Sequence, residues 1–305
     1  MDKVITELLN SGNEAIIAYT KRDLLGEKVN TDFIKDLPRV KRIISKQEKD
    51  GRWAYPGNKG KMQRGYDQYF TMKMLGELVQ KYGLTKKHEA VSKAREFLQS
   101  TQTKEGDYRG IYANQYSPNY SANIMEFLIM AGYDVNKGLN WLLSIRQDDG
   151  GWAIPIRTVK KMPWTEWVNI KEAVEPDRSK KFSHFCTGIS LRPFSLIKKY
   201  HKKLYNTAIL YADSFFERDN YPDRSGIEFW THFTYPYQWA DILNGLDTLS
   251  RIGIKKHPKI TQALNWFKKH KKSNGLWNIH KVMGANDKDS NCWINLQIAR
   301  VLKRF

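Results

Sequence analysis

The sequence repeats one short motif that ends each time in Gly-x-Trp or Gly-x-Tyr. Three copies place an aromatic residue and a second apolar residue before a polar residue and the glycine, and a fourth keeps only the end. The copies are Ala94-x-x-Phe97-Leu98 with Gln102 and Gly106-x-Tyr108, Gly138-x-x-Trp141-Leu142 with Gln147 and Gly150-x-Trp152, Ala263-x-x-Trp266-Phe267 with Lys272 and Gly275-x-Trp277, and Gln47 with Gly51-x-Trp53. Each copy is typical of a helix that ends at a glycine of positive φ, with the next aromatic packed back over the helix end. A chain that repeats such ends is built from helical hairpins.

Apolar residues at helical spacing, such as Ile124, Phe127 and Leu128, fill the stretches between the copies. No alternating strand pattern competes with them. We expect inner helices near 13–25, 66–82, 119–131, 184–200, 238–252 and 291–304, with partners near 1–10, 33–48, 87–101, 136–146, 202–217 and 258–271.

The first and last of these helices lack a neighbour unless the two ends of the chain meet, because an open solenoid would leave two apolar faces unburied. The fold predicted is therefore all-α: an (α/α)6 toroid, a ring of six helical hairpins. We expect a single domain over 1–305 with long connectors at 153–182 and 218–236. Long connectors on a compact scaffold are where function usually lies.

The composition permits a large core, since 41% of the residues are hydrophobic and 13% aromatic. No apolar run approaches the ~20 residues that cross a bilayer, and the first ten residues become polar, so we expect neither a membrane span nor a signal peptide. Cys186 and Cys292 lie far apart in the sequence and are typical of reduced thiols. We therefore expect a cytoplasmic protein.

The chain is strongly basic, with 51 Lys and Arg against 32 Asp and Glu and a formal net charge of +19. Such a field favours anionic partners. The basic residues are dispersed, in pairs such as Lys86-Lys87 and Lys268-Lys269, and no nucleic-acid recognition module is visible. We expect no specific nucleic-acid partner, and the oligomeric state stays open.

The endings in which two or three residues separate Gln from Gly-x-Trp, with an upstream Ala/Gly-x-x-Trp/Phe, resemble the repeat of the protein prenyltransferase β-subunit and squalene cyclase superfamily. The resemblance covers most of the chain. It implies an α/α toroid whose cavity opens at one end of the inner helices. Similar rings also serve polysaccharide lyases and hydrolases.

Two departures from that family limit the chemistry that the resemblance implies. The D-x-D-D run with which class II terpene cyclases protonate an alkene does not occur, so that cyclisation is not expected. The zinc-binding Asp-x-Cys of the prenyltransferases has its nearest counterpart in Asp289-Ser290-Asn291-Cys292, which is one residue too long. We predict no cofactor and no metal, with zinc as the disfavoured alternative.

Two clusters of candidate site residues lie near the starts of the fourth and fifth inner helices. The first is Ser183-His184-Phe185-Cys186, where His184 is a candidate catalytic group and both His184 and Cys186 also suit capping or core positions. The second runs from His232 to Asp241 and brings Tyr237, Trp239 and Asp241 together. Asp241 is a candidate catalytic acid or base, or an acid that only complements the helix dipole.

The third cluster comes from the starts of the second and third inner helices. Asp67 is a candidate catalytic acid, and Tyr66, Asn119, Tyr120 and Asn123 are candidate ligand-binding residues, with ordinary helix caps as the structural alternative. Asp289 is the candidate at the start of the sixth inner helix. We expect the ten side chains to line one pocket at one end of the ring: Tyr66, Asp67, Asn119, Tyr120, Asn123, His184, Tyr237, Trp239, Asp241 and Asp289.

Three functions follow from these features. The first is a prenyltransferase-like or terpene-cyclase-like toroid that binds or transforms an isoprenoid, or another apolar-tailed anionic ligand, in its central cavity. The second is a carbohydrate-active (α/α)6 lyase or hydrolase, in which Asp241 and Asp67 flank a glycosidic bond. The third is a non-catalytic binding scaffold.

Overall fold

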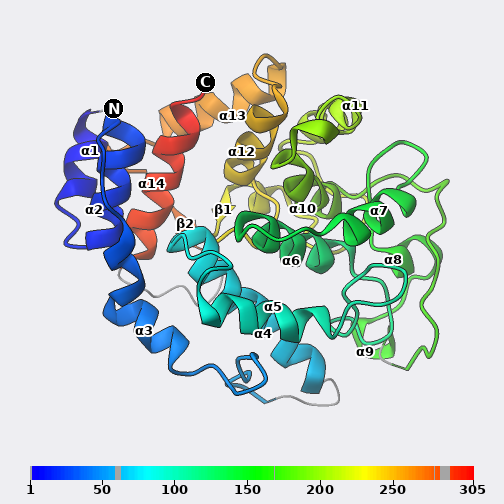
Figure 1. The fold of residues 1–305 in the computed structure, drawn as a ribbon. Helices are drawn as coiled ribbons and strands as arrows, with labels where there is room; N and C mark the ends of the chain where they lie inside the picture. Colours follow the sequence, from blue (N-terminus) through cyan, green and yellow to red (C-terminus); the bar gives the residue numbers. More distant parts are fainter. Residues whose placement is uncertain (1, 59–62, 168, 278, 282–288) are drawn as a thin grey trace.

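The fold is all-α, as predicted. The computed structural model describes residues 2–58, 63–167, 169–277, 279–281 and 289–305. Within them lie fourteen α-helices and two strands of two residues each, β1 (His232–Phe233) and β2 (His280–Lys281), which pair in parallel (Figure 1). No helix in the described part of the chain is long and apolar enough to cross a membrane.

Six helices occupy the positions expected for inner helices: α2 (Glu14–Thr20), α4 (Gln63–Gly76), α6 (Pro118–Met130), α10 (His184–Ser195), α12 (Ile242–Ile252) and α14 (Ser290–Leu302). Short π-helical segments extend α2 over Lys21–Leu25 and α4 over Glu77–Lys81. All twelve residues of α10 are buried, which is expected only of a helix that other elements surround.

Six further helices occupy the expected partner positions: α1 (Asp2–Leu9), α3 (Pro38–Ile44), α5 (Glu89–Gln99), α7 (Asn136–Ser144), α11 (Tyr205–Asp213) and α13 (Pro258–Lys269). Each buries one apolar stripe; α1, for example, buries only Val4 and Leu8. The connector 153–182 contains α8 (Pro155–Val159) and α9 (Trp164–Trp167), and 218–236 contains a 3₁₀ turn and β1.

The inner helices contact one another in sequence order along most of the molecule. Contacts join α4 to α6, α6 to α10, α10 to α12, α12 to α14, and α14 to α2. Helix α1 contacts both α2 and α14, and both ends of the chain lie on the same side of the molecule (Figure 1). The predicted pairing of the first and last helices is therefore confirmed.

The repeated tryptophans pack over the helix ends as predicted. The indole Nε1 of each donates to a carbonyl ten residues earlier: Trp53 to Ile43 at 2.7 Å, Trp152 to Leu142 at 2.7 Å, and Trp277 to Phe267 at 2.8 Å. These carbonyls lie near the ends of α3, α7 and α13, so each indole satisfies an acceptor in a last helical turn.

The motif also ties each outer helix to the next inner helix. The backbone N–H of the motif aromatic donates to a side chain of the inner helix that follows: Trp53 to Thr71, Tyr108 to Ser121, Trp152 to Thr187, and Trp277 to Asn295, at 2.8–3.1 Å. The repetition of this hydrogen bond explains why the hairpins share one geometry.

The motif glycines allow close approach to the neighbouring outer helix. Gly51 and Gly275 have φ of 88° and 93°, which glycine adopts without strain. A Cβ on Gly51 would collide with the carbonyl of Lys93 in α5, and one on Gly275 would lie 2.8 Å from the backbone nitrogen of Val4 in α1. The last copy of the motif thus packs against the first helix of the chain.

Several predicted helix boundaries are wrong; the fourth inner helix, for example, ends at Ser195 instead of 200. The fifth inner helix begins at Ile242 instead of 238, because Asp241 has extended backbone angles and caps the helix. The helix predicted over 33–48 is divided into a 3₁₀ turn, Asp32–Asp36, and α3. Leu37 separates them with ψ of 142°, since a residue that precedes proline is driven out of the helical region.

Candidate functional site

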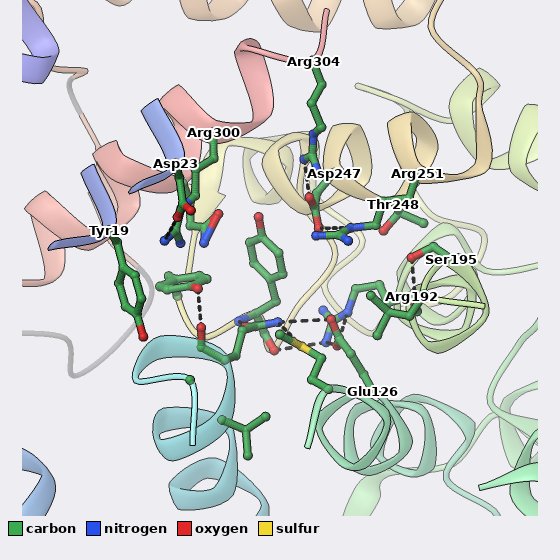
Figure 2. Close-up of a pocket in the computed structure, with 18 of the residues that line it drawn as sticks. Tyr19, Asp23, Glu126, Arg192, Ser195, Asp247, Thr248, Arg251, Arg300 and Arg304 are labelled. Carbon is green, nitrogen blue, oxygen red and sulfur yellow. Dashed lines mark hydrogen bonds and ion pairs between the residues drawn. The ribbon is translucent and has the colours of Figure 1, made fainter. Parts of the chain in front are cut away.

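A large cavity of about 630 Å³ lies where the last turns of the six inner helices meet. Each of the six helices, or the segment that extends it, contributes lining residues near its C-terminal end, so the inner helices share one direction around the cavity. Figure 2 shows the charged side chains from these helices pointing toward one another. We name it the C-terminal cavity; its lining is Tyr19, Arg22, Asp23, Val79, Gln80, Gly83, Glu126, Met130, Arg192, Ser195, Leu196, Tyr235, Tyr237, Asp247, Thr248, Arg251, Gln297, Arg300, Lys303 and Arg304.

The lining of the C-terminal cavity is rich in charge. Six basic residues and three acidic ones line it, which leaves a surplus of three positive charges. A helix C-terminus carries roughly −0.5 of an elementary charge, so six such ends bring a comparable negative potential. The basic surplus of the lining and the helix dipoles therefore roughly offset one another.

Asp23 joins α14 to the segment that extends α2. Its carboxylate accepts from Arg22, with Nε to Oδ1 at 2.6 Å, and also pairs with Arg300. Burial opposes its ionisation, but these two guanidinium groups outweigh burial and hold the pKa of Asp23 below its ordinary value. Lys303 adds hydrogen bonds to the backbone carbonyls of Asp23 and Leu24 at 2.9 and 3.1 Å.

Asp247 forms the corresponding link between α12 and α14. Its carboxylate accepts from Nε of Arg251 at 3.2 Å and pairs with Arg304. Burial raises the pKa of Asp247, but the two guanidinium groups more than compensate, so the pKa lies below its ordinary value. Asp23 and Asp247 therefore each have two arginine partners.

Glu126 and Arg192 form a buried ion pair between α6 and α10. The side chains are 5% and 2% exposed, and Nε of Arg192 donates to Oε2 of Glu126 at 2.8 Å. Burial raises the pKa of Glu126, and Arg192 opposes that rise. The remaining donors of Arg192 reach Asn123, the carbonyl of Tyr237 at 3.0 Å and the carbonyl of Trp239 at 3.4 Å.

Several buried donors at the C-terminal cavity have no acceptor within the described residues. They are Nε of Arg300, Nε of Arg304 and the hydroxyl of Tyr237, whose side chain is only 3% exposed. A buried polar group without a partner costs about 1–3 kcal/mol, so native proteins contain few of them. All three donors belong to residues that line the C-terminal cavity.

Arg192 brings together three of the residues predicted from the sequence. Its guanidinium donates to the side chain of Asn123 and to the backbone carbonyls of Tyr237 and Trp239, and Asn123 in turn donates to the backbone carbonyl of Gln238 at 3.2 Å. Of these residues, Tyr237 lines the C-terminal cavity.

Asp241 caps helix α12. Its Oδ1 accepts from the backbone N–H groups of Leu243 and Asn244 at 2.8 and 2.9 Å, and its side chain is fully buried. Burial raises the pKa of this carboxyl to about 7, although both backbone hydrogen bonds oppose the rise. The structural role that the sequence left open for Asp241 is therefore present, and Oδ2 has no partner within the described residues.

His184 occupies the first position of α10. Its Nε2 lies 3.5 Å from a carboxylate oxygen of Asp219, and its ring packs on Trp230 with centroids 4.5 Å apart. Burial lowers the pKa of His184 to about 4, so the imidazole is neutral at physiological pH. Asp219 also accepts from the hydroxyl of Ser183 at 2.8 Å, which orders the start of the helix.

A second, smaller cavity of about 180 Å³ lies at the opposite ends of α4 and α6. It contains two of the predicted residues, Tyr66 and Tyr120. We name it the tyrosine cavity; its lining is Tyr55, Gly65, Tyr66, Tyr69, Ile111, Tyr112 and Tyr120. Since Tyr237 lines the C-terminal cavity, the expectation that all ten residues line one pocket is wrong.

The remaining predicted residues hold local structure around these helix starts. Asp67 is buried and accepts the backbone N–H of Tyr55 at 2.8 Å. Asn119 donates to the hydroxyl of Tyr112 at 3.3 Å. Asp289 accepts from Nδ2 of Asn13 at 2.7 Å, which links the start of α14 to the start of α2.

Both cysteines are free thiols, and burial raises the pKa of Cys186 well above its ordinary value. No group of three or more His, Cys, Asp or Glu side chains suited to a metal occurs among the residues that the structure describes. The expectation of a protein without zinc stays a prediction.

The arginines of the C-terminal cavity were not among the residues predicted from the sequence. The signal available was a basic residue in the last turns of three inner helices, Arg192 in α10, Arg251 in α12 and Arg300 in α14. A scan against protein-family models and a search of curated proteins found no match to this chain.

Proposed function

We propose that this protein is a closed (α/α)6 toroid that binds an anionic small molecule, with an apolar part, in the C-terminal cavity. Ring closure is supported by the contacts of α14 with α1 and α2, and by the packing of Gly275 against Val4. The shared direction of the six inner helices around one cavity is the arrangement that such a ring requires.

The observation that carries the proposal is a set of buried donors at this cavity for which the described residues supply no acceptor. Arg300 lies in the last turn of α14 and Arg304 follows the end of that helix, so their Nε atoms come from positions four residues apart, and the hydroxyl of Tyr237 adds a third donor. A carboxylate or phosphate group accepts from several such donors at once, and hydrogen bonds to charged groups contribute about 1.5–3 kcal/mol each.

The apolar part of the ligand is supported by the other lining residues. Val79, Met130 and Leu196 line the cavity together with three tyrosines, Tyr19, Tyr235 and Tyr237. Aromatic rings and aliphatic side chains of this kind pack against hydrocarbon. An isoprenoid with an anionic head group is one molecule of this class, as the family resemblance implies.

Binding is better supported than catalysis. The three acids of the cavity, Asp23, Glu126 and Asp247, are each paired with arginine, and a paired carboxylate is a poor proton donor or acceptor. The carbohydrate alternative needs two acids beside one glycosidic bond. Asp241 and Asp67 accept backbone N–H groups instead, at the starts of different inner helices.

Isothermal titration calorimetry with two matched probes tests the proposal. Decyl phosphate and decanol share a tail and differ in the charged head. We expect decyl phosphate to bind with one site per chain and decanol to bind at least about tenfold more weakly, because only the phosphate satisfies the arginine donors. Equal affinities for the two probes would contradict an anion site.

A further inference from the structure

The tyrosine cavity is a second candidate site, independent of the C-terminal cavity. On α4 and α6 its lining residues lie in the N-terminal halves of the helices, whereas those of the C-terminal cavity lie in the C-terminal halves or beyond. Five of its seven lining residues are tyrosines, and none of the seven carries a charge at neutral pH. In a chain with a net charge of +19, a cavity without a basic lining residue is a local exception.

The tyrosine rings form walls at steep angles to one another. Tyr120 is nearly perpendicular to both Tyr69 and Tyr112, with interplanar angles of 79° and 73° and centroids 5.7 and 5.2 Å apart. Tyr55 and Tyr66 stack as a further wall, with centroids 5.1 Å apart. Rings that surround a small space from several directions present more than one π-face or edge to whatever occupies it.

The walls are anchored by hydrogen bonds and close packing. The buried carboxylate of Asp67 accepts the backbone N–H of Tyr55, and Asn119 donates to the hydroxyl of Tyr112. Gly65 lies against the carbonyl of Gly110 so closely that a Cβ would collide with it. All five tyrosine side chains are half-buried, so the cavity is shaped by the fold and remains accessible.

A cation already lies beside this cluster within the chain itself. Nζ of Lys73, which does not line the cavity, lies 5.6 Å from the ring centroid of Tyr69. Aromatic faces attract ammonium groups at distances up to about 6 Å, and several rings around one space are the usual receptor for methylated ammonium ions. The carboxylate of Asp67, next to Tyr66 in the sequence, is paired with Nε of Arg52 at 3.8 Å, so the attraction for a cation rests on the rings.

We infer that the tyrosine cavity binds a quaternary or methylated ammonium group. The rings supply attraction for a cation that cannot be satisfied by hydrogen bonds, because a methylated ammonium has few or no N–H donors. A volume of about 180 Å³ suits a small head group and not a whole extended ligand.

Titration with choline chloride and with 3,3-dimethyl-1-butanol, its uncharged isostere, tests this inference. We expect choline to perturb the near-ultraviolet circular dichroism of the tyrosines saturably, and the alcohol to bind at least about tenfold more weakly. Equal binding of the alcohol would overturn the inference, since the cavity would then be merely apolar. Binding of methyl glucoside without binding of choline would overturn it as well.

Three variants locate the site. Tyr66→Leu and Tyr120→Leu should each weaken choline binding about tenfold, while Tyr120→Phe, which keeps the ring, should change it less than about threefold. Tyr205→Leu, at an exposed tyrosine on α11, is the matched control and should leave binding unchanged. If Tyr66→Leu and Tyr120→Leu both keep the wild-type far-ultraviolet spectrum and the wild-type affinity, the inference is wrong. Decyl phosphate binding should be unaffected in all of them, which separates this site from the C-terminal cavity.

Discussion

Arg192 and Glu126 form an ion pair that is almost entirely removed from water, between α10 and α6 at the wall of the C-terminal cavity. Every nitrogen of the guanidinium group is engaged, by Glu126, Asn123 and two backbone carbonyls. This pair therefore has a structural role, whereas Nε of Arg300 and Nε of Arg304 find no acceptor in the part of the chain that the structure describes.

Removal of Arg192 should destabilise the protein strongly. Arg192→Met leaves the Glu126 carboxylate buried without a counter-charge, and breaking a buried pair in this way costs about 3–5 kcal/mol. The double variant Arg192→Met/Glu126→Leu should recover a large part of that loss, since no buried charge remains. Urea denaturation of the wild type, the single variant and the double variant measures these free energies of unfolding. If Arg192→Met were as stable as the wild type, the ion pair would not contribute to stability.

Asp241→Asn should preserve the helix cap and change the pH dependence of stability. Asparagine caps helices as well as aspartate does, so the hydrogen bonds to Leu243 and Asn244 survive. The pKa of Asp241 is raised by burial from 3.8 to about 7, so the folded state holds a proton that the unfolded state releases. The stability that comes from this tightly held proton is fully present below pH 4 and is lost as the pH rises through 7.

The wild type should therefore lose stability relative to Asp241→Asn between pH 4 and pH 8. Asp241→Ala, which removes the cap, should be less stable than Asp241→Asn by about 1 kcal/mol at both pH 4 and pH 8. Thermal unfolding across this pH range measures the difference. A constant gap between the wild type and Asp241→Asn would show that this carboxyl titrates normally.

Gly275→Ala should destabilise the junction between the two ends of the chain. The substitution adds strain at φ of 93° and also places a Cβ 2.8 Å from the backbone of Val4. Gly12→Ala is the matched control, since Gly12 has φ of 72° with nothing within 4 Å of the added atom. We expect Gly12→Ala to cost about 1 kcal/mol and Gly275→Ala distinctly more. Equal losses in urea denaturation would argue against packing of the ends.

The repeat made the helical hairpins predictable because its glycines and tryptophans act locally. Trp53 donates to a carbonyl at the end of α3 and to a side chain of α4, and Gly51 packs against α5, so two residues of the motif join adjacent helices. Proline and capping effects moved two boundaries: Pro38 divided one helix, and Asp241 delayed the start of another.

The C-terminal cavity could not be found in the same way. Arg192, Arg251 and Arg300 lie about fifty to sixty residues apart in the sequence, where each resembles any basic residue of a basic chain. Only the common direction of the inner helices brings their last turns together. The acids and aromatics at the helix starts were more conspicuous, yet Asp67 and Asp241 accept backbone hydrogen bonds there.

Replacement of Arg300 and Arg304 can be made without stranding a buried acid. Asp23 keeps Arg22, and Asp247 keeps Arg251, so Arg300→Gln/Arg304→Gln should fold and lose little stability. Arg39→Gln/Arg42→Gln is the matched control: it removes the same charge from exposed positions on α3.

Calorimetric titration of these two double variants with decyl phosphate is the most direct test of anion binding in the C-terminal cavity. The affinity of Arg300→Gln/Arg304→Gln should fall at least about tenfold, because two donors to the phosphate are lost. The affinity of Arg39→Gln/Arg42→Gln should match the wild type. If both double variants bind decyl phosphate as the wild type does, the anion does not bind in this cavity.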